Sequence, residues 1–216
     1  MATFYFDFLS PYAYLAWREL PALSKVTNLD FKPTPVLFAA MLNQWGHKGP
    51  AEIPPKRVYV MKNALRLGHR LGHPIEPPPE HPFNPILPLR IAGLDEPRQS
   101  DIIDALFRAV WNGGPGIADE IRVRQVLDKA GFDGHDLVHR AGQPLAKARL
   151  RENTDAAIAA GVFGVPTFVV EGELFWGVDS LPDVVAFAQG KDPVNPSLVQ
   201  RWMVLPAAAQ RNSQSG

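Results

Sequence analysis

Strand-like sequence occurs near the two ends of this chain and is almost absent from its middle. The segment Thr3–Phe8 is rich in aromatic residues and is followed at once by Ser10-Pro11, while residues 29–36 have strand character again. Between them, Tyr12–Leu23 carries apolar residues at helical spacing, with serine as N-cap and proline in the first turn. This order predicts a strand–helix–strand unit, which is usually built on parallel strands.

The second strand-rich region predicts a β-hairpin from Thr167–Val170 and Leu174–Trp176, followed by a helix at Leu181–Phe187. The long interval between the two regions has helical periodicity interrupted by a proline-rich stretch. Helices are expected at Arg57–Leu71, at Ser100–Trp111 with Ser100 as its cap, at Asp119–Ala130 and at Ala141–Gly161, with an irregular segment at Pro74–Pro88.

Removing the helical interval leaves the order of a thioredoxin-like fold. We therefore predict an α/β protein, a discontinuous thioredoxin-like domain at 1–38 and 155–190 with a large all-helical insertion at 39–154. Residues 191–216 form a C-terminal extension, with a short helix at Ser197–Val204 and disorder in the final RNSQSG.

The chain contains no cysteine among its 216 residues, which excludes a disulfide scaffold, thiolate metal ligands and a thiol nucleophile of its own. Its 22 Lys+Arg balance 22 Asp+Glu, which argues against nucleic acid as a partner. Apolar runs are too short to span a membrane, and Asp7 interrupts the apolar N-terminal stretch, so no signal peptide is expected. These features predict a cytoplasmic protein.

Ser10 lies where a strand turns into a helix. A helix N-terminus presents free N–H groups and a partial positive charge of about half a unit, and both stabilise a thiolate. Ser10 and Ala13 occupy the positions that two cysteines hold in C-x-x-C proteins of this fold. Ser10 can therefore donate a hydrogen bond to an anion supplied from outside, or serve only as an N-cap.

Two further motifs lie in the C-terminal region. Val165-Pro166 directly precedes a strand, which favours a cis-proline turn that exposes the backbone of Val165 to an extended peptide; an ordinary trans entry is the alternative. Asp179 precedes the last helix, where its carboxylate can take an ammonium group, or where Asp179 or Ser180 acts only as a helix cap.

Four stretches in this order resemble the 2-hydroxychromene-2-carboxylate isomerase family, a relative of kappa-class glutathione transferases within the DsbA-like thioredoxin group. They are FYFDFLSPYAYLA, GHKGPAEIPPKRVYVMKNALR, HPFNPI and ENTDAAIAAGVFGVPTFVVEGELFWGVDSL, and they extend to about residue 190. The resemblance implies a homodimeric enzyme that uses glutathione as cofactor and acts on a small aromatic substrate.

The resemblance also implies roles for individual residues. Ser10 is the catalytic residue and holds the glutathione sulfur as a thiolate, and the backbone beside Val165-Pro166 pairs with the cysteinyl unit. The γ-glutamyl end is received by Gly177, Val178, Asp179 and Ser180. Tyr12, Lys48 and Asn84 are implied to meet the second substrate, for which no metal is required.

The implied reaction is conversion of 2-hydroxychromene-2-carboxylate to trans-o-hydroxybenzylidenepyruvate in aromatic catabolism. The thiolate adds to the conjugated double bond of the open form, the resulting single bond rotates, and elimination regenerates glutathione. Departures from the family pattern at His47, Gly49, Asn63 and Ser180 bear on the second substrate, and Ser180 is closer to some kappa-class sequences.

Two alternatives stay open at this point. One is a kappa-class-like glutathione transferase or peroxidase acting on another electrophile, and the other is a non-enzymatic DsbA-like binding or chaperone module. The histidine pairs His69/His73 and His135/His139 have a spacing that can bind metal on a helix. Without an H-E-x-x-H motif we interpret them as solvated or structural residues.

Overall fold

The computed structural model describes residues 2–206 and 208. It contains a four-stranded sheet in the order β2-β1-β3-β4, in which β1 pairs parallel with β2 and antiparallel with β3, and β3 pairs antiparallel with β4. The strands are β1 (Ala2–Phe6), β2 (Phe31–Pro35), β3 (Thr167–Val170) and β4 (Glu173–Trp176). The predicted strand–helix–strand unit and C-terminal hairpin are confirmed.

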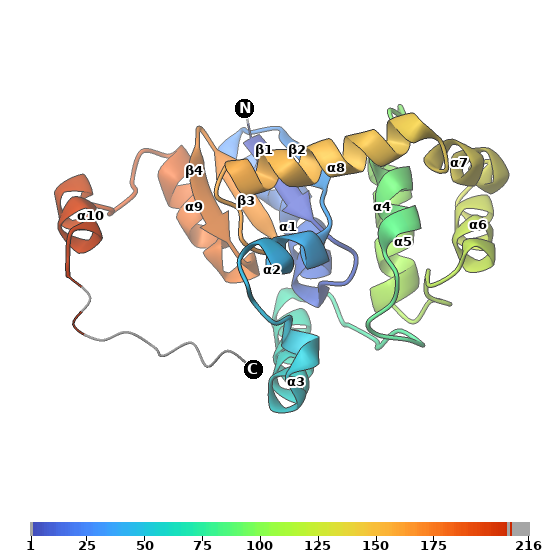
Figure 1. The fold of residues 1–216 in the computed structure, drawn as a ribbon, viewed down its shortest axis with the longest axis horizontal. Coiled ribbons are helices and arrows are strands. Elements are labelled where there is room, and N and C mark those ends of the chain that lie inside the picture. Colours follow the sequence, from blue (N-terminus) through green and yellow to red (C-terminus); the bar gives the residue numbers. More distant parts are fainter. Residues whose placement is uncertain (1, 207, 209–216) are drawn as a thin grey trace.

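Helices cover both faces of this sheet (Figure 1). On one face the rings of Phe4 and Phe168 lie 5.2 Å apart, centroid to centroid, and pack beneath α1 (Pro11–Thr27) and α9 (Leu181–Ala188). On the other face Tyr5 and Val169 pack against a smaller apolar cluster from α2 (Phe38–Gln44) and α8 (Pro144–Ala159). Successive side chains along β1 and β3 point to opposite faces of the sheet, so these strands contribute to two separate hydrophobic clusters.

The interval between β2 and β3 consists of helices joined by irregular segments, with no strand in its residues, all of which the structure describes. Besides α2 and α8 it contains η1 (Pro50–Glu52), α3 (Pro54–Leu71), α4 (Ile86–Ala92), α5 (Gln99–Trp111), α6 (Glu120–Lys129) and α7 (Gly134–Ala141). Figure 1 shows α4 to α7 gathered to one side of the sheet, while α8 runs from α7 back across it. The predicted α/β fold with a large helical insertion is therefore correct.

Three local predictions are wrong. Ser100 does not cap α5 but lies within it, and the N-cap position is held by Arg98 without a side-chain cap. The helix expected at 141–161 is present as α8 but begins only at Pro144, because proline disfavours a helical conformation at Gln143, whose ψ is 155°. Ala141 is the last residue of a separate helix, α7, which was not predicted. The stretch Pro74–Pro88 is irregular only as far as Pro85, the N-cap of α4, so its last three residues are helical.

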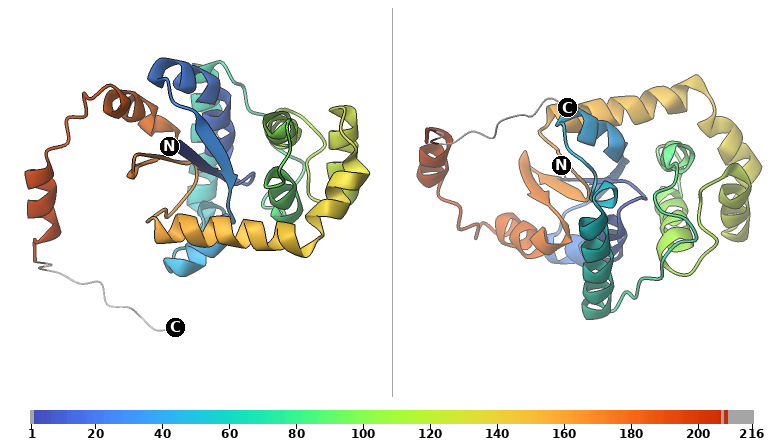
Figure 2. Two further views of the ribbon diagram at one scale, coloured as in Figure 1. Left: turned by 90° about the horizontal axis from the view of Figure 1, so that it is seen from above. Right: turned by 60° about the horizontal axis from the view of Figure 1, so that its bottom comes forward.

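Beyond α9 the chain continues as an arm carrying α10 (Pro196–Met203), which stands apart from the rest of the molecule in each view (Figures 1 and 2). All residues from Gly190 to Pro206 are exposed. The prediction of a short helix here is confirmed, whereas the predicted disorder of RNSQSG lies outside the described residues. No helix in the described part of the chain is long and apolar enough to cross a membrane.

Candidate functional site

Ser10 is buried at the N-terminus of α1, with 8% of its surface exposed. Its Oγ accepts a hydrogen bond from Ala13 N–H at 3.1 Å, so the predicted cap is present. The same hydroxyl donates toward the carbonyl oxygen of Val165 at 3.5 Å. The N–H of Tyr12, in the first turn, has no acceptor among the described residues. Ser10 therefore serves both as cap and as a link to the loop before β3.

The Val165–Pro166 peptide bond is cis, as predicted. The carbonyl of Gly164 accepts a 2.7 Å hydrogen bond from the buried Thr167 hydroxyl, and the carbonyl of Pro166 accepts from Gly177 N–H at 2.9 Å. The N–H of Val165 finds no acceptor in the described part of the chain. Val165 thus offers a free backbone donor beside Ser10, the arrangement that an added peptide strand requires.

The segment Gly177–Ser180 follows β4 directly and forms the short helix η2 (Val178–Ser180). Gly177 has φ 91°, and a Cβ at this position would collide with the Asp179 carboxylate. The Ser180 hydroxyl donates to Gly177 C=O at 2.7 Å and does not cap α9. Asp179 is exposed, and no hydrogen bond or ion pair to it is formed by the residues that the structure describes.

Tyr12 connects the start of α1 with the insertion. Its hydroxyl accepts a hydrogen bond from Asn63 Nδ2 of α3 at 2.9 Å. Burial raises the pKa of Tyr12 above its usual value, and the negative charges of Tyr59 and Asp179 act in the same direction. The helix η2, which contains Asp179, packs against α1, and Gly177 N–H donates to Pro166 C=O. The structure therefore brings together Ser10, Tyr12, Val165 and the segment 177–180.

The other two predicted site residues, Lys48 and Asn84, form no hydrogen bond or ion pair with this cluster. Lys48 is exposed in the link between α2 and η1. The side-chain oxygen of Asn84 accepts a hydrogen bond from Ile86 N–H at 3.1 Å at the start of α4. Asn84 also lines a pocket of about 260 Å³ together with Arg90 and Ile117. Their role in binding a second substrate stays a prediction.

Sequence reasoning missed Asp7, which is fully buried next to the site. Its two carboxyl oxygens each accept a 3.0 Å hydrogen bond, from Leu9 N–H and from Phe38 N–H. Burial raises its pKa from 3.8 to about 6, which outweighs the opposing effect of these two bonds. A charged residue inside an otherwise aromatic strand segment was the available signal, but it served only to argue against a signal peptide.

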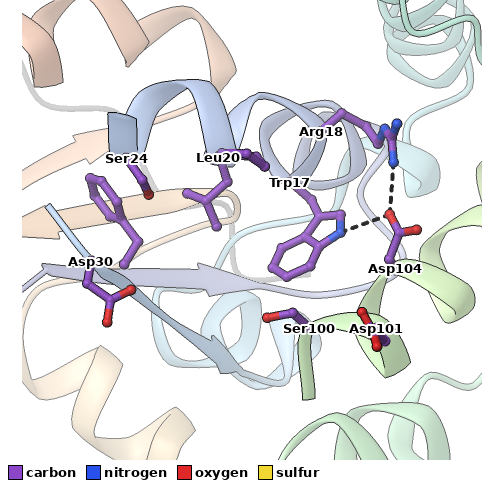
Figure 3. Close-up of a pocket in the computed structure, with 10 residues that line it drawn as sticks. Trp17, Arg18, Leu20, Ser24, Asp30, Ser100, Asp101 and Asp104 are labelled. Carbon is purple, nitrogen blue, oxygen red and sulfur yellow. Dashed lines mark hydrogen bonds and ion pairs between the residues drawn. The ribbon is translucent and has the colours of Figure 1, made fainter. Parts of the chain in front are cut away.

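A second pocket, of about 400 Å³, lies between α1 and α5 and is distinct from this site (Figure 3). Trp17 and Arg18 both donate to the Asp104 carboxylate at its edge, at 3.3 and 2.9 Å. Its α1 residues run from Trp17 to Ser24, whereas Ser10 precedes the first turn.

No group of three or more His, Asp or Glu side chains that could hold a metal ion occurs among residues 2–206 and 208. Of the two histidine pairs, His73 contacts Glu19 of α1 at 2.8 Å, and His139 lies 3.3 Å from the Gln143 amide. Both contacts join a ring nitrogen to a neighbouring side chain rather than to the paired histidine.

Comparison with known proteins agrees with this geometry. The family described as the DSBA-like thioredoxin domain matches residues 2–188. The chain belongs to this DsbA-like thioredoxin family. Within it, 2-hydroxychromene-2-carboxylate isomerase of Pseudomonas putida is 31% identical over 183 residues, covering 82% of this chain and 89% of that protein.

Two further similarities support this placement among DsbA-like proteins. Glutathione S-transferase kappa 1 of Rattus norvegicus is 27% identical over 216 residues, covering 91% of this chain and 95% of that protein. A solved structure of 2-hydroxychromene-2-carboxylate isomerase has a TM-score of 0.77 and 27% identity, and the match covers 95% of this chain and 99% of that one. The resemblance inferred from the motifs is therefore confirmed.

Proposed function

We propose that this DsbA-like protein is a glutathione-dependent isomerase that converts 2-hydroxychromene-2-carboxylate to trans-o-hydroxybenzylidenepyruvate. The observation that carries the proposal is the pairing of Ser10 with Val165 across 3.5 Å in a chain that has no cysteine. A site with thiolate-stabilising groups and a peptide-pairing backbone, but no sulfur of its own, is suited to a thiol that arrives on a peptide cofactor. Glutathione is such a cofactor, and the similar isomerase and kappa-class transferase add weight to it.

In this proposal glutathione lies along the loop before β3. Its sulfur takes the Ser10 hydroxyl hydrogen bond and faces the Tyr12 N–H, so both donors stabilise the thiolate. Its cysteinyl unit pairs with the free N–H of Val165. Its γ-glutamyl ammonium meets the exposed carboxylate of Asp179, which is without a partner in the described residues.

The chemistry is reversible covalent catalysis. The thiolate forms an S–C bond to the β-carbon of the open-chain enone, and the electron pair of the double bond moves to the carbonyl. Rotation about the new single bond follows. Return of the electron pair then re-forms the double bond and expels the thiolate, so glutathione is neither consumed nor oxidised. Tyr12, Lys48 and Asn84 are proposed to meet the aromatic substrate.

Following the absorbance of 2-hydroxychromene-2-carboxylate with and without glutathione tests this function directly. We expect conversion that depends on both protein and glutathione, together with heat of glutathione binding in calorimetry. Conversion at the same rate without glutathione would contradict the cofactor. Absence of glutathione binding would contradict both enzymatic functions and leave the non-enzymatic binding module.

A kappa-class-like transferase is the second candidate, favoured by the match to a kappa-class enzyme over 91% of this chain. The same activated thiolate would then stay bonded to an electrophile and leave as a conjugate. Turnover of 1-chloro-2,4-dinitrobenzene, with no isomerisation of the chromene carboxylate, would select this function. A homodimer in the cytoplasm is proposed for either function, and light scattering after size-exclusion chromatography tests the assembly.

A further inference from the structure

The loop Asp7–Ser10 carries the proposed sulfur-binding hydroxyl and is held by side chains that the proposed function does not use. Within the loop, Ser10 N–H donates to Asp7 C=O at 3.1 Å, and the Asp7 carboxylate accepts from Leu9 N–H. These bonds fix the N–H groups of the loop. Its two middle carbonyls, those of Phe8 and Leu9, accept hydrogen bonds from side chains of the insertion.

His81 holds the carbonyl of Leu9. Its Nε2 lies 3.0 Å from this oxygen, and because a carbonyl only accepts, Nε2 must carry the proton. The other ring nitrogen, Nδ1, is then the unprotonated acceptor of the ring, and it is buried without a hydrogen-bond partner among the described residues. Arg57 of α3 donates to the His81 carbonyl at 2.9 Å and thereby anchors the segment that presents the ring.

Trp111 holds the carbonyl of Phe8. It is the last residue of α5, is fully buried, and donates from Nε1 to that oxygen at 2.9 Å. The rings of His81 and Trp111 lie 5.5 Å apart, centroid to centroid, so each restricts the other. Two consecutive carbonyls directly before Ser10 are therefore held by two mutually packed side chains of the helical insertion.

From this geometry we infer that His81 is a positioning residue for Ser10, through which the helical insertion sets the direction of the sulfur-binding hydroxyl. The inference rests on the proposed function for its catalytic consequence. The Leu9 carbonyl and the Ser10 N–H belong to one peptide group, so without His81 this group would be held only by the bond from Ser10 N–H to Asp7 C=O. This weaker hold would allow the peptide to tilt and Ser10 to shift relative to Val165. The His81 ring touches neither the Ser10 hydroxyl nor the Val165 backbone in any recorded contact, so its effect is transmitted through the Leu9 carbonyl.

Two isosteric substitutions separate the hydrogen bond from the packing. In His81→Gln the amide nitrogen falls near the position of Nε2 and can still donate to Leu9, whereas in His81→Asn it falls near Nδ1 and cannot. Trp111→Phe keeps the aromatic packing and removes the second donor. We expect His81→Gln to stay within about threefold of the unaltered protein and His81→Asn to lose about tenfold in kcat, the effect of one hydrogen bond.

Two readouts are needed for each variant. The ultraviolet absorbance of the bound thiolate, titrated against pH, reports the pKa of glutathione on the protein; we expect His81→Asn to raise it and His81→Gln to leave it unchanged. Partial unfolding would lower the amplitude of this titration without moving its midpoint. Hydrogen exchange at the Leu9 and Ser10 amides, without any ligand, should be about tenfold faster in His81→Asn and in Trp111→Phe.

The outcomes distinguish this inference from the proposed function. If the unaltered protein binds no glutathione, the proposed function fails, while the ligand-free hydrogen exchange still decides whether His81 orders the loop. Equal exchange and equal thiolate pKa in His81→Asn and the unaltered protein would overturn the inference. Equal losses in His81→Gln and His81→Asn would also overturn it, since the Nε2 donor would then not be the relevant feature.

Discussion

The two ends of the chain and its helical middle build the site by different means. The ends contribute mainly backbone groups: the N–H of Tyr12, the N–H and C=O of Val165, and the turn at Gly177. The middle contributes side chains that hold those groups, such as Asn63 on the Tyr12 hydroxyl and His81 on the Leu9 carbonyl. The difference indicates that the fold itself supplies the half of the site that we propose to bind sulfur, whereas individual insertion residues adjust it.

Replacing Ser10, the side chain proposed to contact the glutathione sulfur, should have the largest effect on activity. In Ser10→Ala the thiolate loses a donor, and we expect kcat to fall about 10²- to 10³-fold, as when one oxyanion donor is removed, with a smaller loss of glutathione affinity. Ser24→Ala, on the same helix but in the distant pocket, is the control. Unchanged isomerisation in Ser10→Ala would remove Ser10 from the mechanism.

The next prediction tests Asp7, which ties β1 to the start of α2. Because burial raises its pKa from 3.8 to about 6, the folded protein keeps this proton at pH values where the unfolded chain has lost it. Stability from this group therefore falls as the pH rises from about 4 to about 6. Relative to Asp7→Asn, the unaltered protein should lose up to about 3 kcal/mol of unfolding free energy between about pH 4 and 7.

Urea unfolding of both proteins at the two pH values measures this difference. Asp30→Asn, which alters an exposed carboxylate just before β2, is the control. It keeps Asp7, so its unfolding free energy should fall with pH in parallel with that of the unaltered protein. A constant offset between Asp7→Asn and the unaltered protein across the range would contradict a buried, perturbed carboxyl group.

A smaller loss of function is expected when the backbone at Gly177, which positions the Asp179 side chain, is altered. In Gly177→Ala the added Cβ collides with the Asp179 carboxylate, so we expect about tenfold weaker glutathione binding by calorimetry, about 1.4 kcal/mol. Gly172→Ala is a matched control, because Gly172 has φ 93° with nothing within 4 Å of its would-be Cβ. Both variants share the cost of a positive φ, and equal glutathione affinity in the two would show that Asp179 does not bind the cofactor.

The smallest effect should come from the distant pocket between α1 and α5. Asp101 pairs there with Arg98 at 2.7 Å, and both side chains are more than half exposed. Asp101→Asn should change the unfolding free energy by less than about 0.5 kcal/mol, because exposed ion pairs contribute little. The rate of glutathione-dependent isomerisation should not change. A clear loss of turnover would show that the two regions are coupled more closely than the described contacts suggest.

Local sequence signals predicted the fold and the two turns that carry the proposed sulfur-binding groups. The serine–proline start of α1 and the strand entry at Val165-Pro166 are features of adjacent residues, and both are confirmed as structural elements. Helix starts were less accurate: Ser100 is a good cap residue, yet α5 begins one residue earlier at Gln99, after an N-cap without a side-chain bond. Propensity for a cap is outweighed there by the packing of the helix.

The contacts of His81 could not be predicted from sequence in the same way. His81 and Leu9 are separated by 72 positions, and His81 lies in a proline-rich segment without periodicity. Hydrogen bonds from an isolated side chain to a distant carbonyl leave no repeating pattern. Asp7 differs, since a carboxylate among aromatic strand residues is itself unusual and indicates a buried, hydrogen-bonded role.

The position of α8 limits where segments of this protein can be exchanged with those of a relative. The helix runs from Pro144 to Ala159, packs on α7 and α4 near one end and on β2 and α2 nearer the other, and Thr154 in its second half accepts a hydrogen bond from Leu37 N–H. A chimera that joined the insertion of one relative to the sheet of another at residue 154 would divide a single helix between two parents. Exchange of substrate specificity by recombination should therefore succeed only when α8 is inherited whole.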